Sequence, residues 1–123
     1  MNKTDAIRLF ESLASGIRLD VYRLLVRQGE EGMVAGAIAA ALDLPATTLS
    51  FHLKAMSHAG MVTVVQEGRY LRYRANLPQM LEMIAFLTEE CCGGQPGKCL
   101  ELRAPPACPP AAVPPVPATR VKR

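Results

Sequence analysis

The sequence has 123 residues, half of them apolar, which is enough for one domain with a modest hydrophobic core. Its formal net charge of +3 is too small to indicate a nucleic-acid-binding protein by itself. Residues 1–20 carry scattered charges and no unbroken apolar run, which argues against a signal peptide or a membrane span. We therefore expect a cytoplasmic protein whose four cysteines stay reduced and serve metal binding or redox sensing.

The first half of the chain predicts four helices. Helical spacing of apolar residues predicts one amphipathic helix over residues 3–14 and a second that ends at a glycine-containing break. A short alanine-rich helix is expected over 33–42, and a fourth over 46–58, after a turn at 43–45 and before a stop at Ala59-Gly60. The residues that set this spacing are Ile7, Phe10, Leu13 and Ala14, then Ile17, Val21, Leu24 and Leu25, and finally Leu49, Leu53 and Met56.

The period of the pattern then changes. Residues 61–66 and 70–74 are rich in β-formers and are joined by Glu67-Gly68-Arg69, which predicts a hairpin with Tyr70, Arg72 and Arg74 on one face. The last helix, over 77–91, is apolar around an arc wider than one stripe, so we expect it to contact both the core and a second copy of the chain. A mainly α protein with a β-hairpin in this order is a winged helix-turn-helix, here expected as a homodimer.

Three segments follow from these patterns. Residues 1–92 are expected to form the winged helix-turn-helix domain for DNA binding and dimerisation, and residues 93–103 a loop that carries a cysteine. Residues 104–123 contain seven of the ten prolines and almost no periodic apolar residues, which predicts a disordered tail.

The basic residues point to a DNA-binding face. Residues 44–76 carry four basic residues and one acidic residue, whereas residues 1–43 carry five basic and six acidic residues. In a helix-turn-helix the second helix presents the polar side chains of its start to base edges in the major groove, and basic residues neutralise phosphates. The candidate DNA contacts are Thr47, Thr48, Ser50, Phe51, His52 and Lys54 in the helix over 46–58, and Arg69 and Arg72 in the hairpin.

The same residues have alternative interpretations. Thr47, Thr48 and Ser50 could cap the helix, and the arginines could form an ordinary solvated face. The two histidines are interpreted as a packing or phosphate-facing residue (His52) and a solvated helix end (His58), rather than as metal ligands.

Two stretches resemble the ArsR/SmtB family of metal-responsive repressors. Residues 13–25, LASGIRLDVYRLL, are similar to the second-helix signature of that family. Residues 49–54, LSFHLK, followed by AGMV at 59–62, are similar to its recognition helix and the start of its wing. The resemblance covers about residues 5–92. It implies a symmetric dimer built on the first and last helices that binds an inverted-repeat operator.

Members of this family bind their inducers at different positions. Residues 33–38 contain no cysteine and no histidine follows His58, so two of the known positions are missing from this sequence. Cys91, Cys92 and Cys99 remain, and Gly93-Gly94 can release the helix so that the loop folds Cys99 back over the pair. Three thiolates suit a trivalent arsenical or antimonite, whereas zinc would take a fourth ligand. The pattern resembles arsenic-responsive members whose site follows the last helix.

The sequence thus predicts an arsenical-resistance repressor, with arsenite, methylarsenite or antimonite as inducer. A disulfide from Cys91 or Cys92 to Cys99, giving a redox-sensing repressor, is the main alternative. Structural zinc that also uses Cys108 is another, and Cys108 could be a spare arsenic ligand. An arsenate reductase is excluded because its nucleophilic cysteine needs a helix N-terminus, whereas these cysteines follow a helix C-terminus. A metallochaperone that does not bind DNA is disfavoured by Lys54, Arg69 and Arg72.

Overall fold

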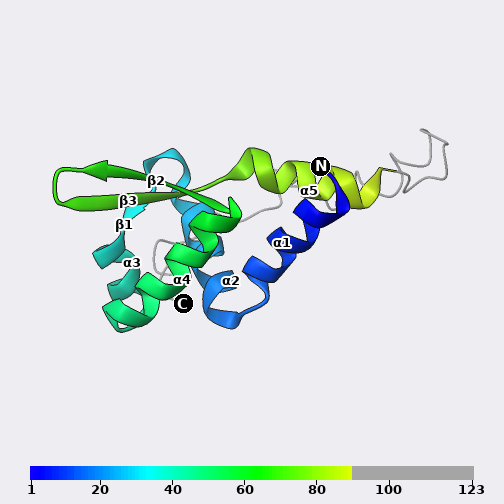
Figure 1. Ribbon diagram of the computed structural model, residues 1–123. Helices are drawn as coiled ribbons and strands as arrows, with labels where there is room; N and C mark the ends of the chain where they lie inside the picture. The colour runs from blue at the N-terminus through cyan, green and yellow to red at the C-terminus, as the bar shows by residue number, and fades with distance from the viewer. Residues whose placement is uncertain (90–123) are drawn as a thin grey trace, which may run out of the picture.

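The structure is a computed structural model that describes residues 1–89. The predicted end of the last helix, the cysteine loop and the proline-rich tail lie outside the described residues. Figure 1 shows the order of elements: α1 (Lys3–Leu13), α2 (Gly16–Gln28), the 3₁₀ turn η1 (Gly29–Glu31), β1 (Met33–Val34), α3 (Ala35–Leu42), α4 (Ala46–Ala59), β2 (Val62–Glu67), β3 (Tyr70–Ala75) and α5 (Leu77–Thr88). This order confirms the predicted winged helix-turn-helix.

Short polar side chains decide where three of the helices begin. The Asn2 carboxamide oxygen accepts a hydrogen bond from the Asp5 amide, the Ser15 hydroxyl accepts one from the Arg18 amide, and the Asn76 side chain accepts one from the Gln79 amide. Each bond satisfies one of the amides that a helix leaves unpaired in its first turn. The ends of α3 and α4 are set by residues in the left-handed conformation, Asp43 and Gly60.

The sheet contains a strand that the sequence did not predict. The described strands pair in the order β1-β3-β2, all antiparallel. Met33 and Val34 pair with Tyr73 and Arg72 of β3, so the helix expected over 33–42 begins two residues later than predicted. Two residues are too few to show a period in the sequence, and their strand conformation depends on pairing with β3.

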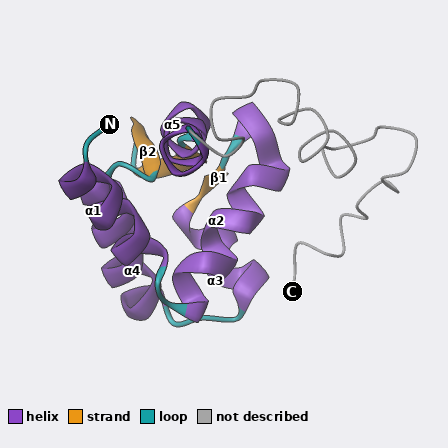
Figure 2. Ribbon diagram, turned by 90° about the vertical axis from the view of Figure 1, so that its right-hand side faces the viewer, coloured by secondary structure: helices purple, strands orange, loops and turns teal. Residues whose placement is uncertain are grey.

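A single cluster of buried apolar residues joins the helices to the sheet. Helix α2 contributes four members, among them Val21 and Leu25, which are completely buried. Figure 2 shows that α1 lies beside α4 and α2 beside α3, with α5 above them. The inward residues predicted for α2 and α4 are confirmed, because Val21, Leu24, Leu25, Leu49, Leu53 and Met56 are all buried and Ile17 packs against the cluster.

Helix α1 buries only part of the face that its apolar spacing suggested, because Leu13 packs against the core but Ala14 is exposed. Its buried residues are Ala6, Leu9 and Ser12, whereas Ile7 and Phe10 are 48% and 40% exposed. In α5 only Met83 is buried, although Met80 packs against the core. The exposed large apolar residues of α5 are Leu77, Leu81, Ile84 and Leu87. Both helices therefore bury one side in the chain and leave a second apolar side uncovered. No helix within residues 1–89 is long and apolar enough to span a membrane.

Gly32 is expected to be essential for stability because of its backbone conformation and its contact with β3. Its φ is +63°, and a Cβ built there would overlap the Tyr73 carbonyl oxygen and lie 2.7 Å from Arg74 Cγ. Gly32→Ala should lower the free energy of unfolding by about 3 kcal/mol in chemical denaturation. Gly36→Ala is the matched control. A Cβ on Gly36 meets no atom within 4 Å, so helix propensity should leave that variant unchanged or up to about 1 kcal/mol more stable. Equal effects of the two substitutions would contradict the packing described for Gly32.

Candidate nucleic-acid interface

Helix α4 has a buried side and an exposed side that match the two roles of a recognition helix. Leu49, Leu53 and Met56 are at most 1% exposed and hold the helix against the core. Ser50 and Lys54 are exposed, and Phe51 is 66% exposed although it is large and apolar. The side chains predicted to read DNA from α4 thus lie outside the core, Thr47 exposed and Thr48 and His52 partly buried.

The start of α4 is free of side-chain caps. Its N-cap is Pro45, and no side chain of the described residues accepts a hydrogen bond at this end. The capping alternative for Thr47, Thr48 and Ser50 is therefore not what the structure has. The turn before the helix is made by Asp43, with φ of 56°, and by the Leu44 amide, which donates to the Ala39 carbonyl over 3.0 Å. The first amides and hydroxyls of α4 are left to bind a partner such as a phosphate.

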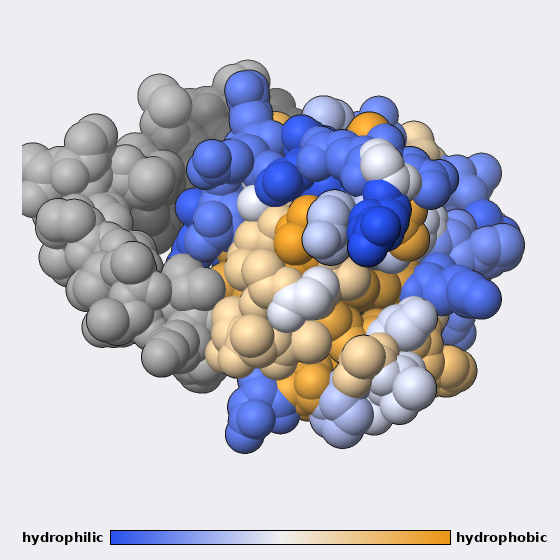
Figure 3. All heavy atoms as spheres, turned by 90° about the vertical axis from the view of Figure 1, so that its left-hand side faces the viewer, coloured by the Kyte–Doolittle hydropathy of each residue, from blue (hydrophilic) through white to orange (hydrophobic). Residues whose placement is uncertain are grey.

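Helix α3, which precedes α4, brings no charge to this region. Its sequence is AGAIAAAL, and Gly36, Ala37 and Ala40 are exposed. Figure 3 views the end of the molecule that carries α3 and the hairpin, and it shows an apolar area beneath a hydrophilic band. Polar contacts with a nucleic acid in this region must come from α4 and the hairpin.

His52 connects α4 to α2. The Nε of Arg18 donates a hydrogen bond to Nδ1 of His52 over 3.0 Å, and the Phe51 ring meets the imidazole edge-on at 5.3 Å between centroids. Nδ1 must be unprotonated to accept this bond. Burial, and secondarily the charge of Arg18, lower the pKa of His52 below its usual value of 6.5. His52 is therefore partly buried, and its hydrogen bond with Arg18 links α4 to α2.

Two arginines of the hairpin, Arg72 and Arg74, form hydrogen bonds within the protein. Arg72 donates from Nε to both carboxylate oxygens of Glu67 at 3.0 Å and from Nη1 to the Glu31 carbonyl at 3.1 Å. Arg74 donates to the Glu30 carbonyl. These bonds tie β3 to η1, so Arg72 has a structural role that the sequence analysis missed. Glu67 and Arg72 are diagonal neighbours on one face of a two-residue hairpin, which is the signal that could have indicated the pair.

Arg69 is placed differently. It follows Gly68, whose φ of 65° makes the tight turn, and it is exposed at the hairpin tip. Of the two hairpin arginines predicted to contact DNA, Arg69 is the one whose side chain has no hydrogen bond or ion pair within residues 1–89.

The predicted inducer site falls in the part of the sequence that follows residue 89. Cys91, Cys92, Cys99 and Cys108 all lie outside the described residues. Within residues 1–89, no three His, Cys, Asp or Glu side chains lie together as metal ligands.

The comparisons agree with this geometry. Residues 13–65 match a helix-turn-helix domain family. An ArsR-like transcriptional regulator from Rhodococcus sp. RHA1 has a similar structure, with a TM-score of 0.58, 21% identity, and coverage of 82% of this chain and 92% of that one. The homodimeric winged helix-turn-helix DNA-binding domain of Mb0332 from Mycobacterium bovis, a possible ArsR-family transcriptional regulator, has a TM-score of 0.57, 27% identity, and coverage of 75% and 85%.

HlyU from Vibrio cholerae N16961 is similar to the same degree, with a TM-score of 0.57, 24% identity, and coverage of 71% of this chain and 97% of that one. No curated protein matches the sequence. The fold and the helix-turn-helix match define this chain as a winged helix-turn-helix protein of the DNA-binding regulator class, and not as an enzyme.

Acidification is expected to destabilise the protein through His52. Because the pKa of His52 is lowered from 6.5, the unfolded chain takes up a proton below pH 6.5 that the folded protein resists. The contribution of neutral His52 to the free energy of unfolding is complete above pH 6.5. It is lost as the pH falls from 6.5 towards the lowered pKa. His52→Asn retains an acceptor for Arg18 and does not titrate. Its free energy of unfolding should therefore fall less than that of the wild type between about pH 7.5 and about pH 5.5. An NMR titration that gives His52 a pKa at or above 6.5 would contradict this account.

Proposed function

We propose that the protein is an ArsR-family transcriptional repressor that binds an inverted-repeat operator as a homodimer and releases it when a trivalent arsenical binds Cys91, Cys92 and Cys99. The DNA-binding part of the proposal is supported by the contrast between the buried side and the exposed side of α4. Leu49 and Leu53 are buried while Ser50 and Lys54 are exposed, so a rigid helix presents polar side chains outward. This is the arrangement by which a recognition helix reads a major groove.

The dimer is proposed from the uncovered apolar sides of α1 and α5. Phe10 on α1 and Leu81 and Leu87 on α5 are 40%, 63% and 58% exposed, and α1 contacts α5 within the chain. Exposed apolar side chains gathered on neighbouring helices favour burial against another surface. The homodimeric state of the similar Mycobacterium bovis domain supports a second copy of this chain as the partner. A two-fold axis through this face would present two α4 helices to half-sites about 34 Å apart.

Each exposed side chain of α4 suits a particular part of DNA. The hydroxyls of Thr47 and Ser50 can bond to base edges, and the Phe51 ring can contact a thymine methyl group. Lys54 would neutralise a phosphate, and Arg69 at the hairpin tip would reach the flanking backbone or minor groove. These contacts give both sequence preference and salt-dependent affinity.

The inducer part of the proposal depends on where the cysteines lie in the chain. Cys91 and Cys92 follow α5 by only a few residues, so a ligand bound there is connected directly to a helix of the proposed dimer interface. Three thiolates fit trivalent arsenic or antimony in charge, softness and ligand number. Binding would favour a dimer geometry in which the two α4 helices no longer match consecutive major grooves. A coupling free energy of about 1–3 kcal/mol is usual for such linkage. A cytoplasmic location would keep the thiols reduced.

The second candidate is a redox-sensing repressor. The same three cysteines support it, because a disulfide from Cys91 or Cys92 to Cys99 would also constrain the segment after α5. The two candidates share the DNA-binding domain and differ in the signal that releases DNA.

Substitutions in α4 should separate affinity from sequence preference. Lys54→Gln is expected to weaken binding to all duplexes and to reduce the slope of log affinity against log salt by about 2 per dimer, because two phosphate contacts are lost. Ser50→Ala should leave that slope unchanged and relax the preference at one base pair of each half-site by about 1–3 kcal/mol. Fluorescence anisotropy on duplexes selected from a random pool measures both quantities. An unchanged salt slope for Lys54→Gln would show that α4 does not face DNA.

Cysteine substitutions should separate the two inducer candidates. Cys91→Ser, Cys92→Ser and Cys99→Ser should each abolish the release of DNA by arsenite without changing DNA affinity, since two thiolates leave one arsenic position to water. Cys108→Ser is the control and should respond as the wild type. Methylarsenite already carries one carbon on arsenic and needs two thiolates, so it should still release the Cys99→Ser variant.

X-ray absorption on the arsenite complex should give sulfur-only coordination in the wild type and mixed sulfur–oxygen coordination in each of the three single variants. Release by peroxide without any arsenical, or release by arsenite that survives Cys92→Ser, would favour the redox-sensing repressor.

A further inference from the structure

Two hollows flank the C-terminal half of α4. One, of about 510 Å³, lies between α4, α1 and the first turn of α2. The other, of about 490 Å³, lies between α4 and β3. Lys54 and His58 line both hollows, so they form a ridge with an open depression on each side. A helix inserted in the major groove has a phosphodiester strand on each side of it, and this ridge has the matching shape.

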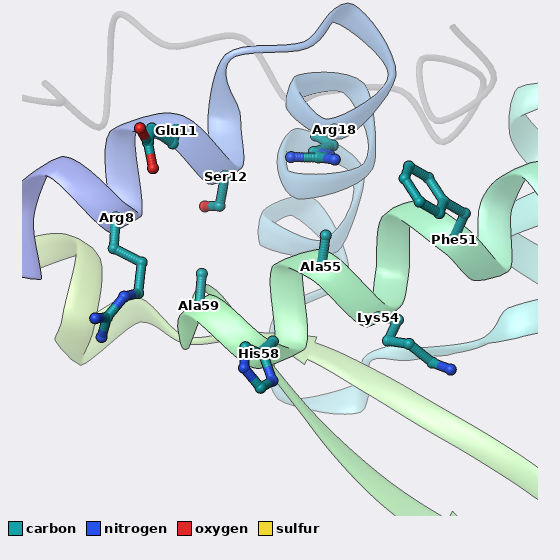
Figure 4. Close-up of a pocket in the computed structure, with 9 residues that line it drawn as sticks. All are labelled: Arg8, Glu11, Ser12, Arg18, Phe51, Lys54, Ala55, His58 and Ala59. Carbon is teal, nitrogen blue, oxygen red and sulfur yellow. The ribbon is translucent and has the colours of Figure 1, made fainter.

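The hollow beside α1 has a floor of small residues and a basic rim. Ser12, Ala55 and Ala59 line it, and the Ser12 hydroxyl already donates to the Leu9 carbonyl over 2.8 Å. Figure 4 shows Arg8 of α1 extending along the same side of the hollow as His58 and Lys54. The only carboxylate in the lining of this hollow, Glu11, lies towards its opposite side in that view. Glu11 therefore does not neutralise the row formed by Arg8, Lys54 and His58.

The place of the Arg8 guanidinium is not explained by a partner among the described residues. Within residues 1–89, neither a hydrogen bond nor an ion pair holds Arg8, Lys54 or His58. Lys54 and His58 are one helical turn apart, so their side chains are spaced along the rim and do not converge on one point. A row of separate basic side chains beside an open depression suits a chain of phosphates better than a single small anion.

We propose that Arg8, with Lys54 and His58, binds one phosphodiester strand of the DNA duplex in this hollow, so that the interface extends beyond the helix-turn-helix to α1. This rests on the proposed DNA-binding function and adds a contact from outside residues 13–65, the part that matches the helix-turn-helix family. Helix α1 then has three uses: its buried side completes the core, Ile7 and Phe10 face a second copy, and Arg8 contacts DNA.

The test compares two charge removals on the same helix. Lys3 is exposed on α1 and does not line the hollow, so Lys3→Gln is matched to Arg8→Gln in charge and exposure. Full-length variants are titrated with a mixed-sequence duplex and with a duplex selected from a random pool by the wild type. Arg8→Gln should reduce the salt slope by about 2 per dimer and weaken both duplexes on the order of tenfold near 0.15 M salt. Arg8→Lys should restore the slope, and Lys3→Gln should leave it unchanged.

Ethylation interference identifies the contact directly. Some of the phosphates whose ethylation blocks DNA binding by the wild type should have no effect on binding by Arg8→Gln. Ethylation of the same phosphates should still block binding by Lys3→Gln. Thermal unfolding of the three variants should match that of the wild type, because both positions are exposed.

The outcomes distinguish this inference from the function on which it rests. If the wild type binds DNA and Arg8→Gln has the salt slope of Lys3→Gln, the inference is wrong and the proposed function stands. If the wild type binds neither duplex, both are wrong. Saturable binding of inorganic phosphate or benzoate that is lost in Arg8→Gln, with an unchanged DNA slope, would identify a small-anion pocket and overturn the inference.

Discussion

The position of α4 depends on burying one side of it in the hydrophobic core, where the helix packs against α1, α2, α3 and β2. Leu49, Leu53 and Met56 are at most 1% exposed, and each such burial stabilises the fold by about 1.5–3 kcal/mol. Hydrophobic contacts fix the depth of a helix but leave its rotation less constrained. The Arg18–His52 hydrogen bond adds a directional restraint, because its donor and acceptor are on different helices. The exposed hydroxyls of α4 are thereby held at a fixed orientation.

The hairpin is held by a different kind of interaction. Its strand β3 pairs with β1 as well as β2, and Arg72 and Arg74 donate to carbonyls of η1. Gly32 allows this close approach, since any side chain there would overlap β3. The wing is thus attached to the region between α2 and α3, and its exposed tip carries Arg69. A DNA duplex would meet α4 and the hairpin tip as separate elements, and their relative position is set by buried contacts and backbone hydrogen bonds.

Helices α1 and α5 connect the DNA-binding elements to the proposed signal. Each buries a narrow side in the chain and exposes a second apolar side, and α1 also lies against α4. A change in how two copies meet on this face would move α4 relative to its symmetry mate. In the proposed function, an arsenical or a disulfide at the cysteines, which follow α5 in the sequence, would act through α5. The proposed regulation needs no contact between the inducer and α4.

The sequence by itself determined the order of the helices and of the hairpin, because apolar periodicity and glycine turns are local signals. It also determined the inward residues of α2 and α4 and named the exposed residues of α4. Three features were decided only by tertiary structure. Met33 and Val34 form a strand because β3 lies beside them, and Arg72 donates to the Glu31 carbonyl because η1 lies near β3. Ala6, Leu9 and Ser12, rather than Ile7 and Phe10, form the buried side of α1, because the contacts of α1 with α2, α4 and α5 decide which side of the helix faces the core. Such long-range contacts leave no trace in local periodicity, because they depend on which elements become neighbours in the folded chain.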